Sequence, residues 1–318
     1  MKKVAVIGSG SFGTAISQIV SKNVEEVILY SRRDDLTKTI EKTGYNLEYY
    51  PNTKLNPNIK PTSNLSEIKN SHIIFLSIPS SAIRKTLKEI KNFLNGKILV
   101  NVAKGIEYPS LKTMGKIIEE YTDDYVVLSG PNFASEIILD LNTITNIGAK
   151  KSENAEIIKN ILESDKIKVK IIEDLDGIEL CGIMKNINAI AYGICEGMNI
   201  SKNGKYGVLT KGFKDTKKIL SKIGGDPETV DSYCGFGDLV LTSTSTESRN
   251  NTLGVLYGKK LIVSESSGVI FEGKNSIMAI KELCEKNSVK SIIVDFVYEV
   301  IVEKVAPTLA FKKLWDNI

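Results

Sequence analysis

The sequence predicts an α/β protein whose N-terminal domain is a doubly wound parallel sheet and whose C-terminal domain is all-helical. Three observations support this prediction. Apolar runs of strand length alternate with helical segments in the first half of the chain, a glycine-rich turn follows the first run, and longer helical segments dominate from about residue 177. Continuously apolar strands are typical of parallel sheets covered on both faces. We therefore expect two domains, residues 1–176 and 177–318, in agreement with about 150 residues per domain.

The strands expected in the first domain are short apolar runs that end at glycine, proline or polar residues. Val4–Gly8 ends in the glycine-rich turn, and Ile73–Ile78 ends at Pro79. Segments with helical spacing follow these two runs at Thr14–Val20 and Ser80–Leu94. The other expected strands are Glu26–Tyr30, Lys97–Val102, Tyr125–Ser129, Thr143–Gly148 and Ile167–Ile172, with a Pro- and Asn-rich connection from Pro51 to Pro61. The helices expected in the second domain are Ile178–Gly197, Gly207–Ile223, Ser276–Glu285 and Ser291–Val302.

The composition excludes several classes of protein. Hydrophobic residues make up 42% and charged residues 25%, as in soluble globular proteins, and the net charge of +4 is too small and too evenly spread to indicate a nucleic-acid surface. The chain has no run of about 18 apolar residues that would predict a membrane span. Gly8 and Gly10 interrupt the N-terminal stretch that superficially resembles a signal peptide, so we expect a cytoplasmic protein.

The rare residues narrow the possible chemistry. The four cysteines form no C-x-x-C pair, so neither a zinc knuckle nor a disulfide framework is expected. His72 is the only histidine, which excludes a histidine metal cluster, and we expect no metal. Proton transfer would therefore fall to lysine, aspartate, glutamate or tyrosine. Each arginine weakly indicates a place where a planar guanidinium matters, because this lysine-rich chain has only Arg32, Arg33, Arg84 and Arg249.

The glycine-rich turn predicts a dinucleotide-binding, Rossmann-like domain. It has the pattern G-x-G-x-x-G, lies directly after the first expected strand and opens a helix. Gly8 would allow the tight turn, Gly10 the approach of a pyrophosphate, and Gly13 the close packing of helix on strand. The helix that follows would then offer its free N–H groups and its partial positive charge to the phosphates.

The end of the second strand bears on the choice between NAD and NADP. An acidic residue at this place would bind the ribose 2′-hydroxyl of NAD, but the chain has Arg32 and Arg33 after Tyr30. Two cations here favour the 2′-phosphate of NADP(H). NAD(H) stays an alternative, because Asp34 and Asp35 follow and would serve it if the strand ended later.

Short polar motifs follow the apolar segments in a specific order. They are K-G-I-E at Lys104–Glu107, S-G-P-N-F-A at Ser129–Ala134, K-N at Lys185–Asn186, G-F-G-D-L at Gly235–Leu239, S-R-N at Ser248–Asn250, and E-G at Glu272–Gly273. With the glycine-rich turn, this series resembles the NAD(P)-dependent sn-glycerol-3-phosphate dehydrogenases of the bacterial type over essentially the whole chain. The resemblance implies reversible hydride transfer between dihydroxyacetone phosphate and glycerol 3-phosphate, and a possible homodimer.

The resemblance also implies roles for individual residues. Lys185 corresponds to the family's general base, Lys104 to a second active-site lysine and Asp238 to a polar residue beside them. Substrate contacts are implied for Lys104, Gly130, Asn132, Lys185, Asn186, Asp238, Thr242, Ser248, Arg249 and Asn250. Cofactor contacts are implied for Ser11, Phe12, Arg32, Lys104, Ala134, Arg249, Ile270 and Glu272, in addition to Gly8, Gly10, Gly13 and Arg33, which the motif and the end of the second strand already indicate.

These roles suit the expected chemistry. Reduction of a ketone needs a proton for the carbonyl oxygen, which a lysine ammonium can give. A phosphate dianion needs charge-assisted donors, which Arg249 can supply.

The chain departs from the family pattern at Asn203–Gly207 with Lys211, at Phe271 and at Asn132. Two other functions stay open: a 3-hydroxy-acid dehydrogenase with a lysine base, and a non-catalytic Rossmann protein that senses NAD(P)H.

Overall fold

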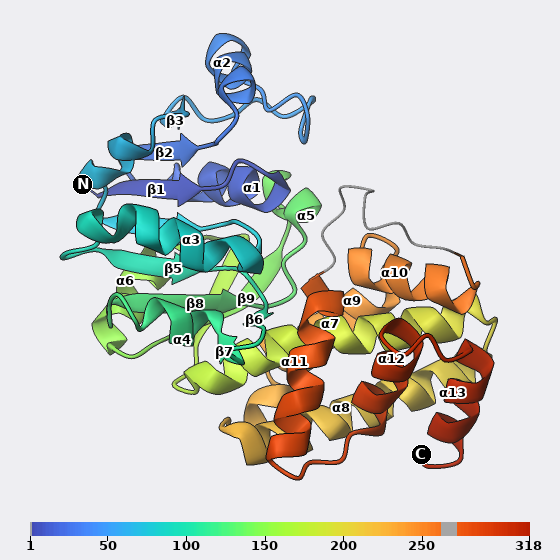
Figure 1. The fold of residues 1–318 in the computed structure, drawn as a ribbon. Helices are drawn as coiled ribbons and strands as arrows, with labels where there is room; N and C mark the ends of the chain where they lie inside the picture. The colour runs from blue at the N-terminus through green and yellow to red at the C-terminus, as the bar shows by residue number, and fades with distance from the viewer. Residues whose placement is uncertain (1, 262–271) are drawn as a thin grey trace. The chain divides into compact units, whose positions relative to one another are not determined.

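The computed structural model describes residues 2–261 and 272–318. The chain forms two compact units. The first contains Met1–Ala103 and Met114–Glu173, and the second contains Lys104–Thr113 and Asp174–Ile318. The predicted order of a parallel-dominated sheet followed by helices is confirmed (Figure 1).

The first unit is built on an eight-stranded sheet with the order β10-β9-β8-β5-β4-β1-β2-β3. All neighbouring strands are parallel except β8 and β9, which are antiparallel. The apolar runs form the central strands because both faces are covered, and Val4, Val6 and Phe75 are completely buried. The strands are β1 (Lys3–Ile7), β2 (Glu26–Tyr30), β3 (Ile59–Thr62), β4 (Ile73–Leu76), β5 (Ile98–Asn101), β8 (Tyr125–Ser129), β9 (Thr143–Ala149) and β10 (Ile167–Ile171).

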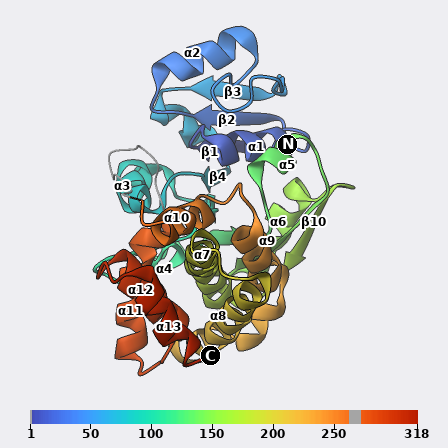
Figure 2. The ribbon, with the colours of Figure 1, turned by 90° about the vertical axis from the view of Figure 1, so that its right-hand side faces the viewer.

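Helices lie on both faces of this sheet. α1 packs against α5 and α6 on one face, and α3 packs against α4 on the other (Figures 1 and 2). The helices of this unit are α1 (Ser11–Val20), α2 (Asp34–Thr43), α3 (Ser80–Ile90), α4 (Met114–Ile118), α5 (Ala134–Ile138) and α6 (Ser152–Leu162), with short 3-10 turns at Leu65–Asn70 and Lys91–Phe93.

One strand of the sheet was not expected from the sequence. β3 forms inside the connection that the Pro and Asn content indicated as irregular, and it contains Pro61. It pairs only with β2 at the edge of the sheet, where a residue without an N–H group is tolerated. The strand propensity of these residues therefore did not indicate β3, and their pairing with β2 determines the structure of this segment.

The second unit surrounds a long central helix. α7 is buried on nearly all sides and packs against α8, α9, α10, α11 and α12. It begins after Asp174, whose carboxylate accepts a hydrogen bond from the N–H of Gly177 at 2.9 Å and so caps the helix. The helices are α7 (Leu175–Gly197), α8 (Lys202–Ile223), α9 (Asp238–Thr244), α10 (Arg249–Gly258), α11 (Glu272–Lys286), α12 (Ile292–Ile301) and α13 (Pro307–Trp315), with a 3-10 turn at Pro227–Asp231 and a π-helical turn at Tyr233–Gly237.

Glycines allow α7 and α10 to pack unusually closely. A Cβ atom on Gly193 of α7 would lie 2.2 Å from the carbonyl oxygen of Asn251, and one on Gly254 of α10 would lie 2.2 Å from that of Ile190. Gly197 and Gly258, one turn further along each helix, make equivalent approaches. This glycine seam fixes the position of α10, whose first residue is Arg249.

The second unit differs in one respect from the all-helical domain that the sequence predicted. A small antiparallel hairpin of β6 (Ile106–Glu107) and β7 (Lys112–Thr113) belongs to it. The expected boundary at residues 176 and 177 left these residues in the first domain, but β6 packs on α11 of the second unit. The chain passes into the second unit at Lys104 and returns to the first unit at Met114. A single boundary along the sequence cannot describe these two additional passages.

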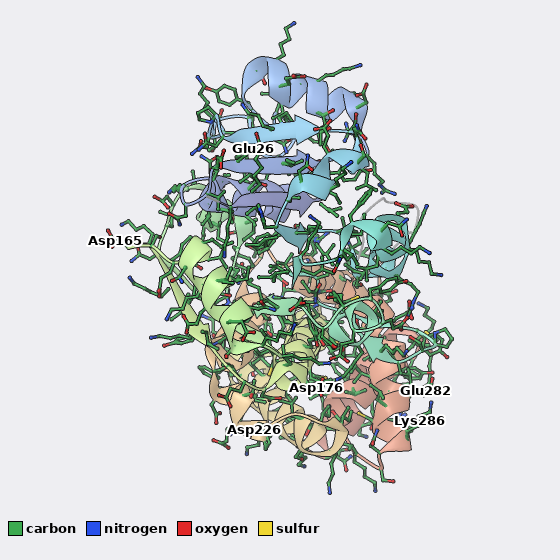
Figure 3. All side chains as sticks on the ribbon, turned by 90° about the vertical axis from the view of Figure 1, so that its left-hand side faces the viewer. Glu26, Asp165, Asp176, Asp226, Glu282 and Lys286 are labelled. Carbon is green, nitrogen blue, oxygen red and sulfur yellow. The ribbon has the colours of Figure 1, made fainter. Side chains whose placement is uncertain are left out.

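Charged side chains lie on the surfaces of both units. On α11, Lys286 forms an ion pair with Glu282 one turn earlier, at 2.8 Å (Figure 3). Among the described residues, no helix is both long and apolar enough to cross a membrane.

Candidate active site

The glycine-rich turn has the geometry that a dinucleotide requires. Gly8 has φ +113°, and its N–H donates to the carbonyl oxygen of Tyr30 at 3.0 Å. A Cβ atom on Gly8 would lie 2.1 Å from the backbone oxygen of Ser77, and one on Gly13 would lie 1.8 Å from that of Gly8. No larger residue fits at either position without a shift of the backbone.

The start of α1 is open to a ligand. A Cβ atom on Gly10 would meet no described atom within 4 Å. The first helical hydrogen bond runs from Thr14 N to Gly10 O at 3.0 Å, and no side chain caps the helix. The N–H groups of Ser11, Phe12 and Gly13 thus precede the helical hydrogen bonds, as an anion-binding helix N-terminus requires. These residues fit the pyrophosphate of NAD(P).

Two side chains that the sequence analysis missed support this turn. The Asn46 amide is fully buried and donates to Ser9 O at 3.0 Å and to the Thr14 hydroxyl at 2.8 Å. The Tyr50 hydroxyl lies 2.6 Å from the Ser11 hydroxyl and donates to Ser11 O at 3.1 Å. Burial raises the pKa of Tyr50, so its hydroxyl stays protonated. No local pattern could reveal these contacts, because they join residues more than 30 positions apart.

The two arginines after β2 differ in their surroundings. The Arg33 guanidinium forms ion pairs with Asp35 at 2.9 Å and with Glu48 at 2.5 Å. Arg32 is exposed and forms no hydrogen bond or ion pair with any residue in the described part of the chain. Arg32 is therefore the cation available to an anionic ligand here, whereas two carboxylates already neutralise Arg33.

A second group of predicted residues meets in the helical unit. The Asp238 carboxylate accepts from Lys104 Nζ at 2.7 Å and from Lys185 Nζ at 3.1 Å. The Thr242 hydroxyl joins them, because it accepts from Lys185 at 2.9 Å and donates to Asp238 at 2.9 Å. We call these four residues the lysine–aspartate cluster.

The secondary structure explains how the lysine–aspartate cluster forms. Lys185 lies within α7, Lys104 precedes β6, and Asp238 begins α9 directly after the π-helical turn. Asp238 and Thr242 are one turn apart and therefore face the same side of α9. A π-helical turn often marks a functional site, since it changes the direction in which the next side chain points.

The electrostatics of the cluster keep Asp238 ionised. Its side chain is only 2% exposed, and burial alone would raise the pKa of the carboxyl. The charges of Lys104 and Lys185 and their hydrogen bonds outweigh burial, so the pKa of Asp238 lies below its usual value. Two ammonium groups therefore contact one buried carboxylate.

Other predicted substrate residues lie in the same unit. Asn186 is 3% exposed, and its amide makes no hydrogen bond with the described residues, so it can serve a ligand. Ser248 caps α10 by accepting from Asn251 N at 3.2 Å, so the sequence signal there includes a structural role. Arg249 is exposed in the first turn of α10, next to Asn250.

The remaining predicted residues belong to the first unit or to the region around residues 262–271. Gly130 and Asn132 follow β8, and the Asn132 amide lies 3.0 Å from the Thr145 hydroxyl. Ala134 begins α5. Ile270 and the unusual Phe271 lie outside the described residues, and Glu272 is the first residue of α11. Of the other departures, Lys211 on α8 forms an ion pair with the buried Asp215.

The sequence analysis also missed a contact near Lys104. The Thr113 hydroxyl donates to the Glu179 carboxylate at 2.5 Å, and Glu179 is 8% exposed on α7. Glu179 lies six residues before Lys185 in the sequence, but nothing there indicated that Thr113, 66 positions away, is its partner.

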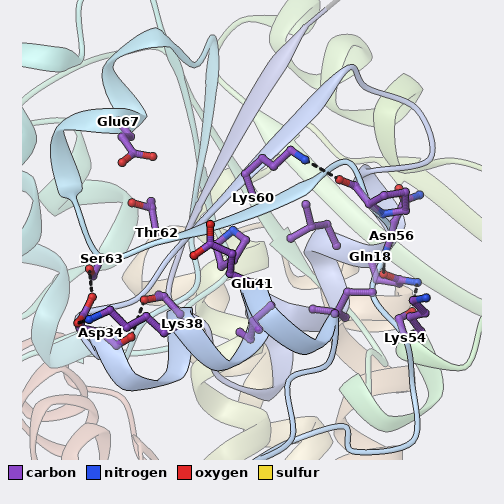
Figure 4. A pocket seen from close by; sticks show the side chains of 17 residues that line it. Gln18, Asp34, Lys38, Glu41, Lys54, Asn56, Lys60, Thr62, Ser63 and Glu67 are labelled. Atoms are coloured by element: carbon purple, nitrogen blue, oxygen red, sulfur yellow. Dashed lines mark hydrogen bonds and ion pairs between the residues drawn. The ribbon is translucent and has the colours of Figure 1, made fainter.

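A large hollow in the first unit is separate from these residues. It has a volume of about 1030 Å³ and lies between α2, β3 and the segment before β3 (Figure 4). Of the residues considered for the site, only Asp34, the alternative partner of NAD(H), is among those that line it. Its polar groups pair with one another, as Asp34 does with Lys38 at 2.7 Å and with Ser63 at 2.9 Å.

In the described part of the chain, no group of three or more histidine, cysteine, aspartate or glutamate residues could hold a metal ion.

A Rossmann turn combined with a lysine–aspartate cluster in a helical unit places the chain in the class of NAD(P)-dependent oxidoreductases. Comparison with known proteins identifies the family. Residues 3–155 match the model of the NAD-dependent glycerol-3-phosphate dehydrogenase N-terminus, and residues 174–312 match the model of its C-terminus. The chain belongs to the NAD-dependent glycerol-3-phosphate dehydrogenase family.

Individual relatives match this chain over nine-tenths or more of their own length. A glycerol-3-phosphate dehydrogenase (NAD(P)+) of Methanothermobacter thermautotrophicus is 38% identical over 99% of this chain and 98% of its own. That of Bacillus subtilis is 35% identical over 95% of this chain and 90% of its own. The crystal structure of glycerol-3-phosphate dehydrogenase from Coxiella burnetii has a TM-score of 0.93 at 26% identity, and the match covers 99% of both chains.

Proposed function

We infer that this chain reduces dihydroxyacetone phosphate to sn-glycerol 3-phosphate, reversibly, with NAD(P)H as the hydride donor. The lysine–aspartate cluster carries this inference, because it supplies both a proton donor and a positive charge in a chain of this family. When bound, the reduced nicotinamide supplies the hydride.

Lys185 is the proposed acid and base of the reaction. Its ammonium group would donate a proton to the carbonyl oxygen during reduction, and the neutral amine would accept it back during oxidation. Asp238 and Thr242 hold Nζ from two sides, which fixes the direction of the proton transfer. Lys104 shares the same carboxylate, so its charge would favour an oxygen that becomes negative in the transition state.

Substrate specificity would come from groups that recognise the phosphate. Arg249 offers a forked guanidinium at the N-terminal end of α10, where the helix dipole also favours an anion. Asn186, Ser248 and Asn250 are the proposed neutral partners of the substrate, as the family resemblance implies. Gly130 and Asn132 are further proposed substrate contacts, as the family resemblance implies.

For the cofactor, Gly8, Gly10 and Gly13 with Ser11 and Phe12 would hold the pyrophosphate. Arg32 would pair with the 2′-phosphate of NADP(H), since it is exposed and carries no carboxylate partner among the described residues. We propose a smaller role for Arg33 than its place in the sequence indicates, because Asp35 and Glu48 hold its guanidinium.

The test is a steady-state assay with dihydroxyacetone phosphate and each of NADH and NADPH. We expect oxidation of the cofactor with this substrate and little with a panel of 3-oxo acids, which a 3-hydroxy-acid dehydrogenase would reduce. Tight cofactor binding without any turnover would instead indicate a protein that senses NAD(P)H, and would overturn the proposal.

Two finer expectations accompany this function. We propose a homodimer and a cytoplasmic location, both from the resemblance and the sequence. Sedimentation equilibrium at several protein concentrations tests the first, and fractionation of the source cells tests the second. A monomer at all concentrations, or recovery outside the cytoplasm, would contradict them.

A further inference from the structure

The hairpin excursion, residues 104–113, is held to the helical unit at both ends. At its first residue, Lys104 Nζ lies 2.7 Å from Asp238 Oδ2. At its last residue, Thr113 Oγ1 donates to Glu179 Oε2 at 2.5 Å. The chain enters the excursion from Ala103 and leaves it at Met114, both of which belong to the first unit. A hydrogen bond that involves a charged group thus lies at each end of the excursion.

The pairing of β6 and β7 connects the two ends mechanically. Thr113 lies opposite Ile106 in the antiparallel register, and Lys104 precedes Ile106 by two residues. Leu111 N donates to Glu107 O at 2.8 Å and closes the turn between the strands. Ile106 is buried, and β6 packs on α11. A displacement of Thr113 would therefore shift β6 and the segment before it, which contains Lys104, because the pairing of β6 with β7 couples them.

Glu179 is a rigid point of attachment. It is 8% exposed and lies on α7, the same helix that carries Lys185 six residues later. A buried carboxylate is costly unless it accepts hydrogen bonds, so the donor at Thr113 stabilises it there. α7 therefore links the position of the excursion to that of Lys185, the proposed general base.

We propose that Glu179 is a positioning residue that holds Lys104 in the lysine–aspartate cluster by fixing Thr113 at the other end of the excursion. This inference rests on the proposed function, since it assigns Glu179 and Thr113 an effect on the reaction that Lys104 assists. Neither residue is proposed to touch substrate or cofactor.

The experiment compares Thr113→Val, which keeps the shape but removes the hydroxyl, with Thr113→Ser, which keeps the hydroxyl. We expect Thr113→Val to lower kcat/KM for dihydroxyacetone phosphate by about 10-fold, a modest share of what a misplaced catalytic group costs. Thr113→Ser should stay within about 3-fold of the parent, because the hydrogen bond to Glu179 is retained. The dissociation constant of NADPH, measured by fluorescence, should be unchanged in Thr113→Ser.

A double-mutant cycle with Lys104→Met separates positioning from a general loss of structure. If Thr113 acts through Lys104, adding Thr113→Val to Lys104→Met should lower kcat/KM by less than about 2-fold further. A full additional 10-fold loss, or equal activity of the Val and Ser variants, would overturn the proposal. If Thr113→Val does not fold, Glu179→Leu, which cannot accept the hydrogen bond, takes its place in the same cycle, where a loss that persists in the Lys104→Met background would count against positioning.

Hydrogen exchange tests the anchor independently of the reaction. Amides of residues 104–113 should exchange faster in Thr113→Val than in Thr113→Ser, and equal rates would overturn the inference. Absence of turnover in the unmodified chain would contradict the proposed function alone, because the exchange comparison would still decide whether Glu179 holds the excursion.

Discussion

The proposed chemistry of this chain centres on one buried carboxylate. Asp238 holds the ammonium groups of Lys104 and Lys185 within 3.1 Å, although it is almost inaccessible to solvent. Removing one partner of a buried charged group is costly, because the other charge is then left uncompensated. The same arrangement that orients the proposed proton donor therefore also contributes to the stability of the helical unit.

Replacement of Lys185 by methionine tests the proposed acid and base. The variant keeps an unbranched side chain of nearly the same length but has no proton to donate, so we expect kcat to fall by at least about 100-fold. NADPH binding should be nearly unchanged, since the glycine-rich turn belongs to the first unit. The exposed Lys214 on α8 provides the matched control, Lys214→Met, which should keep full activity. Near-normal turnover in Lys185→Met would remove this residue from the mechanism.

The lowered pKa of Asp238 predicts a specific pH dependence of stability. A carboxyl whose pKa is lower in the folded than in the unfolded protein stabilises the fold above its unfolded value, about 3.8, and this stabilisation is lost as the pH falls through the folded value. Asp238→Asn should therefore reduce the dependence of the unfolding free energy on pH below about 4. Urea titrations at pH 6, 4 and 3 measure this difference. Curves that stay parallel for the parent and the variant would contradict it.

The different surroundings of Arg32 and Arg33 give separate expectations for the two residues. Arg32→Ala should raise the KM for NADPH more than that for NADH, since only NADPH carries the 2′-phosphate. Arg33→Ala should have a smaller effect, because Asp35 and Glu48 already neutralise its charge. The KM values for NADPH and for NADH, measured for the parent and for each variant, test both expectations. Equal effects of Arg32→Ala on both cofactors would show that this residue does not distinguish them.

At the scale of elements, the glycine seam between α7 and α10 couples Lys185 to Arg249. α7 carries the proposed base, α10 begins with the proposed phosphate ligand, and the two helices approach closely enough that carbonyl oxygens contact glycine Cα atoms. Side chains at these positions would separate the helices and move Arg249 relative to Lys185.

Gly193→Ala should consequently destabilise the protein. Its Cβ would lie 2.2 Å from Asn251 O, a backbone atom that cannot rotate away, and overpacking of this kind costs about 2 kcal/mol. Gly207→Ala on α8 is the matched control, because its Cβ would meet only Trp315 at 3.8 Å. Alanine is the better helix former by about 1 kcal/mol, so Gly207→Ala should be neutral or stabilising. Urea unfolding compares the two variants, and equal stability would contradict the seam.

For the whole molecule, periodicity predicted the elements with strong apolar patterns and missed those that depend on tertiary contacts. The central strands and α7 follow from their apolar runs. β3 and the short helices α9, α10 and α13 gave no comparable signal, since their residues are polar or few and packing decides their structure. The motifs selected Lys104, Lys185 and Asp238, but the contacts of Asn46, Tyr50 and Thr113 join distant positions and could not be read from one sequence.

The division into units leads to a last prediction. Residues 174–318 produced alone lack the hairpin excursion, so Asp238 loses one of its two cations and Glu179 loses the Thr113 donor. β6 would also no longer cover α11. We expect this fragment to unfold at a lower urea concentration than the same fragment with residues 104–113 attached through a flexible glycine–serine linker. Far-ultraviolet circular dichroism measures both midpoints. Identical midpoints would show that the helical unit does not need the excursion, and that the boundary near residue 176 describes an independent domain.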